Sequence, residues 1–471
     1  MFDDEICLLS AREMAAQIRL GRLSARQAVE AHLARVERVN PRVNAIVTLA
    51  AERALAQARA ADEEQARGRA LGPLHGLPVA HKDLQDTAGV RTTYGSRLFQ
   101  DFVPALDSFL VERLRQAGAI ALGKTNTPEF GAGSQTFNEV FGATRNPYDL
   151  EKTCGGSSGG AAVALACGMV ALADGSDMGG SLRNPASFCN VVGMRPSPGW
   201  APCWPALSGW STLSVEGPMA RTVADVALFL SAVAGPESRW PISTRERGEQ
   251  FAQPLERDFR GARVAWYRDL GGLPFDPRVR AVVDEQRKVF ASLGCEVEEA
   301  EPDFTGADEA FRSIRAALFH MALGALPAER LRLVKQTVVE EVERGRRLAP
   351  ADLARAGVLR TELYFRLREF FTRYEFFVLP TSQVPPFALD RQWVAEVDGV
   401  PMESYIDWMR SCFYVSATGS PALAVPAGFT AEGLPVGLQI VGRHTDNLGV
   451  LQLGFAFEQA TAAGRRRPAW T

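Results

Sequence analysis

Serines set among glycines are the residues of this chain best suited to chemistry. Ser157 and Ser158 lie in the run 154–160, and Ser181 lies in the run 177–185, with glycines next to them in both runs. Glycine has no Cβ, so it leaves neighbouring backbone N–H groups open to a ligand and permits torsions that other residues avoid. Each run can therefore present a hydroxyl and adjacent amides to a bound molecule.

Predicted helix and strand segments border both serine runs. Residues 161–168 have the small-residue pattern of a helix, and 169–173 form a short apolar run typical of a buried strand. Most Gly/Ser-rich runs are flexible linkers. Linkers, however, are not bordered on both sides by apolar helix and strand signals. The sequence therefore favours a functional site held by regular secondary structure. One serine run precedes a helix, and the other follows a strand.

Lysine is rare in this chain, which makes each retained lysine informative. Of 52 basic residues, five are lysines, at positions 82, 124, 152, 288 and 335. A buried lysine can lose its proton and act as a base, whereas arginine cannot. Lys82 ends a predicted strand at 79–83. A surface ion pair with Asp83 or Asp86 is the ordinary alternative.

Two familiar motifs match by letter and lack the structural context that they need. Residues 118–125 match a phosphate-binding loop, but a helix precedes them and the inner residues Ala-Ile-Ala-Leu predict a strand rather than exposed amides. Residues 155–159 match the Gly-x-Ser-x-Gly turn of α/β-hydrolases, but the upstream segment 148–153 is polar where that turn requires a hydrophobic strand. Neither motif supports its usual function.

Histidine and cysteine give no pattern for metal or thiol chemistry. The five histidines are scattered, so neither a histidine-based triad nor a metal site has support. The seven cysteines lack metal-type pairs, as expected of reduced thiols. Cys154 beside the glycines has no local basic partner, which favours a small buried residue over a nucleophile.

Composition narrows the classes of partner. The chain has 471 residues, a net charge of −3 and a pI near 6.1, with acidic and basic residues interspersed. This distribution predicts small neutral substrates and no binding of nucleic acid or anionic lipid. The acidic N-terminus is unlike a signal peptide, and no run reaches the length of a membrane span. We therefore expect a cytoplasmic protein without membrane contact.

Secondary-structure signals outline a large α/β protein. Residues 10–68 predict helices, with Ser10 and Ser24 as caps. A β-α-β pattern over 263–298 predicts parallel pairing. Residues 307–372 are mostly helical and charged. Further buried strands and a closing helix are predicted at 376–381, 422–426, 433–442 and 446–462.

Spaced motifs then give the chain a resemblance to a known family. They are Val-Ala-His-Lys-Asp around Lys82, Gly-Lys-Thr-Asn at 123–126, Gly-Gly-Ser-Ser-Gly-Gly at 155–160 and Gly-Ser-Asp-Met-Gly-Gly-Ser-Leu-Arg-Asn-Pro at 175–185. Together with segments at 379–381, 419–426 and 433–440, they resemble the amidase signature family over nearly the whole chain. The resemblance implies one large α/β/α domain with a mixed central sheet, a Ser-Ser-Lys triad that hydrolyses C–N bonds, and no metal or organic cofactor. Its expected parts are a helical arm (1–70), a core with the catalytic residues (71–235), a helical variable part (236–372) and C-terminal strands with a helix (373–471).

The resemblance also implies a role for individual residues. Ser181 would be the nucleophile, Ser157 the bridging serine after a cis peptide at Gly156, and Lys82 the base. Backbone amides of Met178, Gly179 and Gly180 would form the oxyanion hole, and Ser158, Asp177 and Arg183 would support the loops. One departure is Arg195, where the family usually has lysine. The general use of arginine in place of lysine in this chain accounts for it.

Neighbouring segments indicate which residues could line a substrate pocket. The resemblance places Phe130, Gly131, Ala132 and Gly133 near the acyl side, and Trp204 and Trp210 follow the nucleophile loop closely enough to border the entrance. No arginine or lysine pair is apparent in these segments to bind a carboxylate or phosphate. We therefore expect hydrolysis of neutral aryl or alkyl amides and anilides, with esters and carbamates (urethanes) also accepted. The tryptophans could equally be ordinary core residues.

Two other functions remain open at this point. The glutamine-hydrolysing component of glutamyl-tRNA amidotransferase, its A subunit, shares these motifs and works within a complex, although this chain shows no basic surface signal. A noncatalytic protein on the same scaffold is the second alternative, which the presence of all three triad residues disfavours. We expect a monomer or a homodimer.

Overall fold

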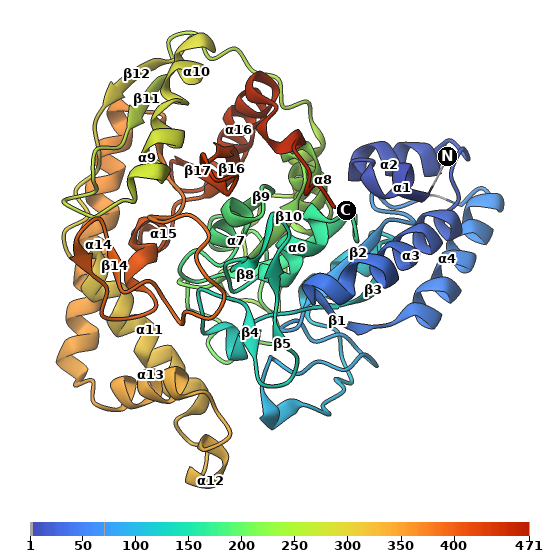
Figure 1. Ribbon diagram of the computed structural model, residues 1–471, viewed down its shortest axis with the longest axis horizontal. Coiled ribbons are helices and arrows are strands. Elements are labelled where there is room, and N and C mark those ends of the chain that lie inside the picture. Colours follow the sequence, from blue (N-terminus) through green and yellow to red (C-terminus); the bar gives the residue numbers. More distant parts are fainter. Residues whose placement is uncertain (1–2, 70, 471) are drawn as a thin grey trace.

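A mixed β-sheet forms the centre of the structure, a computed structural model that describes residues 3–69 and 71–470 (Figure 1). Within these residues the sheet has eleven strands. Their spatial order is β1 (Ile46–Leu49), β3 (Ile120–Thr125), β2 (Pro78–Lys82), β8 (Leu172–Asp177), β10 (Val215–Ala220), β9 (Val192–Arg195), β16 (Ala422–Phe429), β17 (Pro435–Gly442), β13 (Phe376–Pro380), β11 (Arg263–Trp266) and β12 (Glu296–Glu299). β2 is parallel to β3 and β8, and β11 is parallel to β12 and β13; the other neighbours are antiparallel. The expected mixed sheet is confirmed.

Helices flank this sheet. α6 (Gly159–Ala166) and α7 (Arg183–Phe188) contact each other and the central strands, and α8 (Val223–Val233) and α16 (Asn447–Thr461) form a second contacting pair. The other helices are α1 (Asp3–Leu8), α2 (Ala11–Arg19), α3 (Ala25–Val43), α4 (Ala51–Ala66), α5 (Phe109–Gln116), α9 (Pro277–Asp284), α10 (Arg287–Ser292), α11 (Ala307–Leu323), α12 (Ala328–Leu331), α13 (Gln336–Arg346), α14 (Pro350–Arg373) and α15 (Arg410–Thr418). Short 3₁₀ turns lie at Arg97–Phe99, Glu129–Gly131, Gly248–Ala252, Asp407–Met409 and Ala463–Arg465. Small two-stranded sheets are β4 (Phe137–Asn138) with β5 (Gly142–Ala143), β6 (Arg145–Asn146) with β7 (Asp149–Thr153), and β14 (Glu396–Val397) with β15 (Val400–Pro401).

The N-terminal arm is helical as expected, with one addition. Ser10 and Ser24 each form a complete capping box, with Glu13 and Gln27 respectively, which explains why α2 and α3 begin where they do. The addition is β1, which pairs with β3 at the edge of the sheet. Its residues Ile-Val-Thr-Leu are largely β-branched and suit a strand. The arm is therefore joined to the sheet by backbone hydrogen bonds as well as by packing.

The two serine runs lie at the ends of α6 and β8. α6 is buried on all sides, and a Cβ on Gly160 would lie 2.3 Å from the backbone nitrogen of Asn126, so only glycine fits there. The strand predicted at 169–173 begins later, at Leu172, and continues to Asp177. Pairing with β2 and β10 sets these limits, since Leu172 is opposite Val79 and Asp177 is opposite Val215. Ser176 and Asp177 are consequently held by the sheet.

The later half of the chain completes the sheet and adds a helical flank. The predicted parallel pairing of 263–298 is confirmed by β11 and β12. α11, α13 and α14 pack together on the side of the molecule opposite the N-terminal helices, and α12 lies at the tip of this flank (Figure 1). Most buried apolar residues form one core cluster. A second small cluster joins α11 and α13 to the segment around Ala132.

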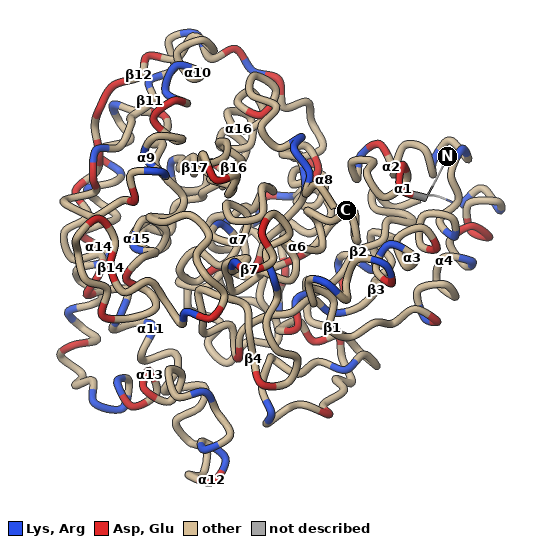
Figure 2. Tube along the Cα trace, viewed as in Figure 1, with Lys and Arg blue, Asp and Glu red and all other residues tan. Residues whose placement is uncertain are grey.

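Charged residues of both signs alternate along the chain, with no long tract of either sign (Figure 2). None of the helices in the described part of the chain combines the length and the apolar character needed to span a bilayer.

Candidate active site

Lys82 is a fully buried lysine surrounded by serine hydroxyls. It ends β2, whose five residues are all buried. Its Nζ lies 2.7 Å from Ser157 Oγ, 2.9 Å from Ser158 Oγ and 3.0 Å from Ser176 Oγ. The three N–H donors of an ammonium group would all be used by these contacts. The alternative of a surface ion pair with Asp83 does not occur, because Asp83 accepts from Thr93 Oγ1 at 2.5 Å instead.

The environment of Lys82 favours its neutral form. Burial lowers the pKa of Lys82 from 10.5 to about 7, although Asp177, Asp174 and Glu216 act in the opposite direction. A lysine with a pKa near 7 is partly unprotonated at neutral pH. The contact with Ser157 then allows Lys82 to accept a proton from that hydroxyl.

Ser157 follows a cis peptide bond with Gly156, as the resemblance implied. It lies just before α6, and the next residue, Ser158, is the N-cap of that helix. The backbone N–H of Ser158 donates to the carbonyl of Ser181 at 3.1 Å. This hydrogen bond joins the two serine runs and fixes the distance between them.

Asp177 organises the loop that carries Ser181. Its carboxylate accepts from the backbone N–H groups of Gly180 and Leu182, at 2.8 and 3.1 Å, and from the guanidinium of Arg183 at 3.0 Å. Burial alone would raise the pKa of Asp177, but Arg183 and Arg195 hold that pKa well below its usual range. The loop is thus closed around a permanent carboxylate.

Arg195, the departure from the family pattern, belongs to this network. It is fully buried on β9, and its Nη1 lies 3.3 Å from Asp177 Oδ1. A second cation beside Asp177 is therefore retained with arginine in the place of lysine.

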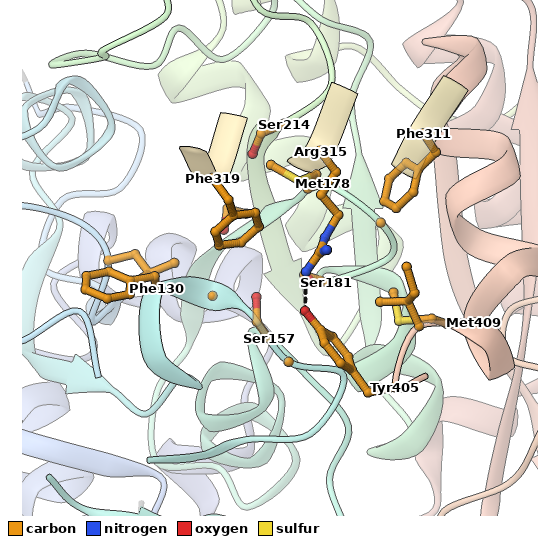
Figure 3. A pocket seen from close by; sticks show the side chains of 16 residues that line it. Phe130, Ser157, Met178, Ser181, Ser214, Phe311, Arg315, Phe319, Tyr405 and Met409 are labelled. Atoms are coloured by element: carbon orange, nitrogen blue, oxygen red, sulfur yellow. Dashed lines mark hydrogen bonds between the residues drawn. The ribbon is translucent and has the colours of Figure 1, made fainter. Parts of the chain in front are cut away.

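Both serine runs open into one cavity. Its polar lining residues are Ser157, Ser176, Ser181, Ser214, Tyr405 and Arg315, and its other lining residues are Leu84, Phe130, Gly131, Gly133, Met178, Gly179, Phe311, Phe319, Ile406 and Met409 (Figure 3). Ser181 keeps 9% of its surface exposed, so a ligand in the cavity can reach it. The fold brings Ser157 and Ser181 together although 24 positions of the sequence, largely α6 and β8, separate them.

The amides proposed for an oxyanion hole divide into two groups. Met178 and Gly179 line the cavity beside Ser181. The N–H of Gly180 is already used, because it donates to Asp177, and Gly180 does not line the cavity. Of the three expected donors, Gly180 is therefore already engaged, and Met178 and Gly179 stay predictions for this role.

Three residues expected at the pocket lie elsewhere. Ala132 is buried in the small second cluster. Trp204 stacks beneath the guanidinium of Arg239, and its carbonyl accepts from Phe109 N–H. Trp210 is 77% exposed. The segment 200–210 folds against α5 and the 236–242 turn instead of the cavity, so nearness in sequence to the nucleophile loop was misleading.

The residues that replace them come from two later parts of the chain for which no role at the pocket was predicted. Phe311, Arg315 and Phe319 on α11 line the cavity, as do Tyr405 and Met409. Residues spaced by four lie on one helix face, so the pattern Phe-x₃-Arg-x₃-Phe was the available signal. A basic residue does line the wall, although none was apparent from the segments considered in the sequence.

The motifs rejected on sequence grounds are explained by the structure. Lys124 lies within strand β3, is fully buried, and donates to the Gln85 carbonyl and to Thr87 Oγ1, so residues 118–125 form no phosphate loop. A strand, β7, does precede residues 155–159, but it belongs to a small separate sheet. Burial raises the pKa of Cys154 to about 12, which disfavours a thiolate nucleophile. Among the described residues, no cluster of three or more His, Cys, Asp or Glu could hold a metal ion.

Comparison with known proteins finds relatives over nearly the whole chain. A family model described as Amidase matches residues 27–451. An acylamidase from Rhodococcus erythropolis is 37% identical over 100% of this chain and 99% of its own length. The A subunit of glutamyl-tRNA(Gln) amidotransferase from Moorella thermoacetica is 37% identical over 98% of this chain and 99% of its own length. The crystal structure of a bacterial aryl acylamidase of the amidase signature family has a TM-score of 0.92 at 27% identity, covering 98% of this chain and 99% of that chain.

The chain therefore belongs to the amidase family, within the amidase signature enzymes. It is an amidohydrolase.

Proposed function

We propose that this amidohydrolase cleaves neutral small-molecule amides, in particular aryl and alkyl amides and anilides, through Ser181, Ser157 and Lys82. The observation that carries the proposal is the buried Nζ of Lys82 at 2.7 Å from Ser157 Oγ, in a site whose cavity Ser157 shares with Ser181. The acylamidase and aryl acylamidase relatives support an anilide substrate.

The proposed reaction begins with proton transfer through the two serines. Neutral Lys82 accepts the proton of Ser157, which in turn accepts that of Ser181. Ser181 Oγ then attacks the carbonyl carbon, and the N–H groups of Met178 and Gly179 stabilise the oxygen on which negative charge develops. The proton returns along the same route to the leaving nitrogen as the C–N bond breaks. Water repeats the sequence on the acyl-enzyme and releases the acid.

The residues that line the cavity favour uncharged substrates. Apart from Arg315, the described residues that line it are uncharged, and several large apolar side chains lie beside the serines: Leu84, Phe130, Met178, Phe311, Phe319 and Met409. Esters and carbamates present the same acyl carbon to Ser181, so we propose that they are cleaved as well. The protein would act as a monomer or homodimer in the cytoplasm, without nucleic acid.

A second candidate is the A subunit of a glutamyl-tRNA amidotransferase, because one relative of that name is as similar as the acylamidase. This function requires glutamine as amide donor and partner subunits. Copurification of such subunits, or glutaminase activity that depends on tRNA, would favour it.

The test of the proposed function is a hydrolysis screen of anilides, alkyl amides, esters, carbamates and glutamine with the wild type and Ser181→Ala. We expect turnover of the neutral substrates by the wild type and none by the variant, because the nucleophile is missing while no core volume is lost. Intact-mass measurement after phenylmethylsulfonyl fluoride should show an adduct on the wild type alone. An adduct on Ser181→Ala at the active site, or higher kcat/KM for glutamine than for anilides, would contradict the proposal.

A further inference from the structure

Arg315 stands apart from the rest of the cavity wall. It is the one charged residue among the described residues that line the cavity, and 4% of its surface is exposed. In Figure 3 its side chain extends between Phe311 and Phe319 towards Tyr405 on the side of the cavity where Ser181 lies. A cation buried this deeply is costly unless it is paired. Its partners therefore determine what the wall can bind.

The charge of Arg315 is neutralised by Glu341 from α13. Arg315 Nη1 lies 2.5 Å from Glu341 Oε2, and Glu341 is itself 8% exposed. A second arginine, Arg344, lies 3.8 Å from Glu341, but its side chain is about half exposed to solvent. Within the buried site, a bound carboxylate would therefore meet the pair as a third charge and leave an excess of negative charge. The wall therefore disfavours anionic substrates even though it contains an arginine.

Arg315 and Tyr405 together still offer a hydrogen-bond donor to a neutral ligand. Arg315 Nη2 donates to the hydroxyl of Tyr405 (Figure 3), and Arg315 Nη1 forms the ion pair with Glu341. Burial raises the pKa of Tyr405, so its hydroxyl keeps a proton at neutral pH. Among the described residues no acceptor is found for that proton. A buried O–H that lacks an acceptor and lines a cavity favours a ligand oxygen beside it, next to the guanidinium of Arg315.

We infer that Arg315, Tyr405 and Glu341 form a subsite that selects substrates with a second, uncharged acceptor oxygen, such as the carbonyl of another amide, carbamate or ester. This inference rests on the proposed function and narrows its substrate class. Arg315 and Tyr405 would contact that oxygen, and Glu341 would act as a positioning residue that excludes carboxylates by its charge.

Three p-nitroanilides with acyl groups of equal size test the subsite: 4-carbamoylbutanoyl with a neutral acceptor, 5-methylhexanoyl without one, and 4-carboxybutanoyl with a carboxylate. For the wild type we expect kcat/KM for the carbamoyl substrate to exceed that for the apolar one by about 10-fold and that for the carboxylate by about 100-fold. The ratio of two kcat/KM values measured on one variant does not depend on the fraction of that variant that is folded.

The variants then separate the roles of the two charges. Arg315→Met should remove the advantage of the carbamoyl over the apolar substrate. Glu341→Gln, which keeps the shape of the side chain, should raise the ratio of carboxylate to carbamoyl by at least about 10-fold, because it leaves Arg315 with a free positive charge. The double variant Arg315→Met/Glu341→Gln should lose that gain. Arg346→Met is the matched control, since Arg346 is an exposed arginine of the same helix as Glu341 whose ion pair is with Glu343; its ratios should match those of the wild type.

Two failures have different meanings. Cleavage that depends on Ser181 but shows ratios unchanged by Arg315→Met, or no gain for the carboxylate with Glu341→Gln, would overturn the subsite and leave the proposed function standing. Absence of Ser181-dependent cleavage of all three anilides would overturn the proposed function and the subsite with it.

Discussion

Lys82 shows how one buried side chain obtains its reactivity from its surroundings. Desolvation lowers its pKa to about 7, while three carboxylates limit the shift. Its neighbours are hydroxyls, which hydrogen-bond with either the charged or the neutral form of the amine. A guanidinium in the same place would stay protonated. Lys82 is one of five lysines in a chain that otherwise uses arginine, and it lies where the proposed reaction requires a base that can lose its proton.

We expect Lys82→Arg to lower kcat/KM by about 10²- to 10⁴-fold, the usual contribution of a general base. In the wild type, kcat/KM should rise with pH through about 7 and level off above it, because the neutral lysine is the active form. Initial rates with an anilide between pH 5.5 and 9 measure both effects. A variant of normal activity, or a profile that is flat with chemistry rate-limiting, would contradict the role of Lys82.

At the scale of elements, the site depends on how closely α6 approaches its neighbours. Gly160 allows the first turn of α6 to contact the backbone of Asn126 and Ala45, with no room for a methyl group. Ser157 and Ser158 immediately precede this turn. The position of these two serines relative to Lys82 therefore depends on how the whole of α6 packs against its neighbours.

Gly160→Ala should displace α6, because its Cβ would lie 2.3 Å from Asn126 N and 2.7 Å from Ala45 O. We expect the free energy of unfolding to fall by roughly 1–3 kcal/mol, as for other overpacked sites. We expect kcat/KM to fall by about 10-fold or more, since small misplacements of catalytic groups are costly. Denaturant unfolding and anilide kinetics give the two values.

Gly357→Ala is the control for this substitution. Gly357 is exposed within α14, and a Cβ there would meet nothing within 4 Å. Alanine is the better helix former, so this variant should gain about 0.5–1 kcal/mol and keep its activity. Equal effects of the two substitutions would show that the close approach at Gly160 is not what holds α6.

For the molecule as a whole, burial of Lys82 has a cost in stability. The pKa of Lys82 is about 7 in the folded protein and near its ordinary 10.5 in the unfolded chain. Between these values the unfolded chain binds more protons than the folded one, so the contribution of Lys82 to stability increases as pH rises. Below pH 7 the contribution stays at its lowest value.

The melting temperature of the wild type should therefore rise relative to that of Lys82→Met between pH 7 and pH 9. Two pH units correspond to about 2.7 kcal/mol, or about 3 °C for a chain of this length. Scanning calorimetry of both proteins at one scan rate measures the difference. Lys288→Met removes an exposed lysine and should show no such trend. If the difference in melting temperature between the two proteins did not change with pH, the pKa of Lys82 would not be lowered in the folded protein.

The sequence by itself identified the family, the mixed sheet, and the residues Lys82, Ser157 and Ser181. These features are encoded locally, because glycines beside a serine, a lysine at the end of an apolar strand and a capping serine each act through their neighbours in the chain. The family and the fold are confirmed, and the catalytic roles remain proposals. The pairing of β1 with β3 was not predicted, since a four-residue edge strand gives little signal.

Only the tertiary structure decided what surrounds the serines. Arg315 and Tyr405 are 90 positions apart, and Glu341 comes from a third segment. Their meeting depends on α13 packing against α11 and on the turn before α15 lying against α11, where Arg312 pairs with Asp407. Trp210, which is near the nucleophile loop in sequence, lies at the surface instead. The pattern Phe-x₃-Arg-x₃-Phe places three residues on one helix face, but long-range packing decides that this face lines the cavity.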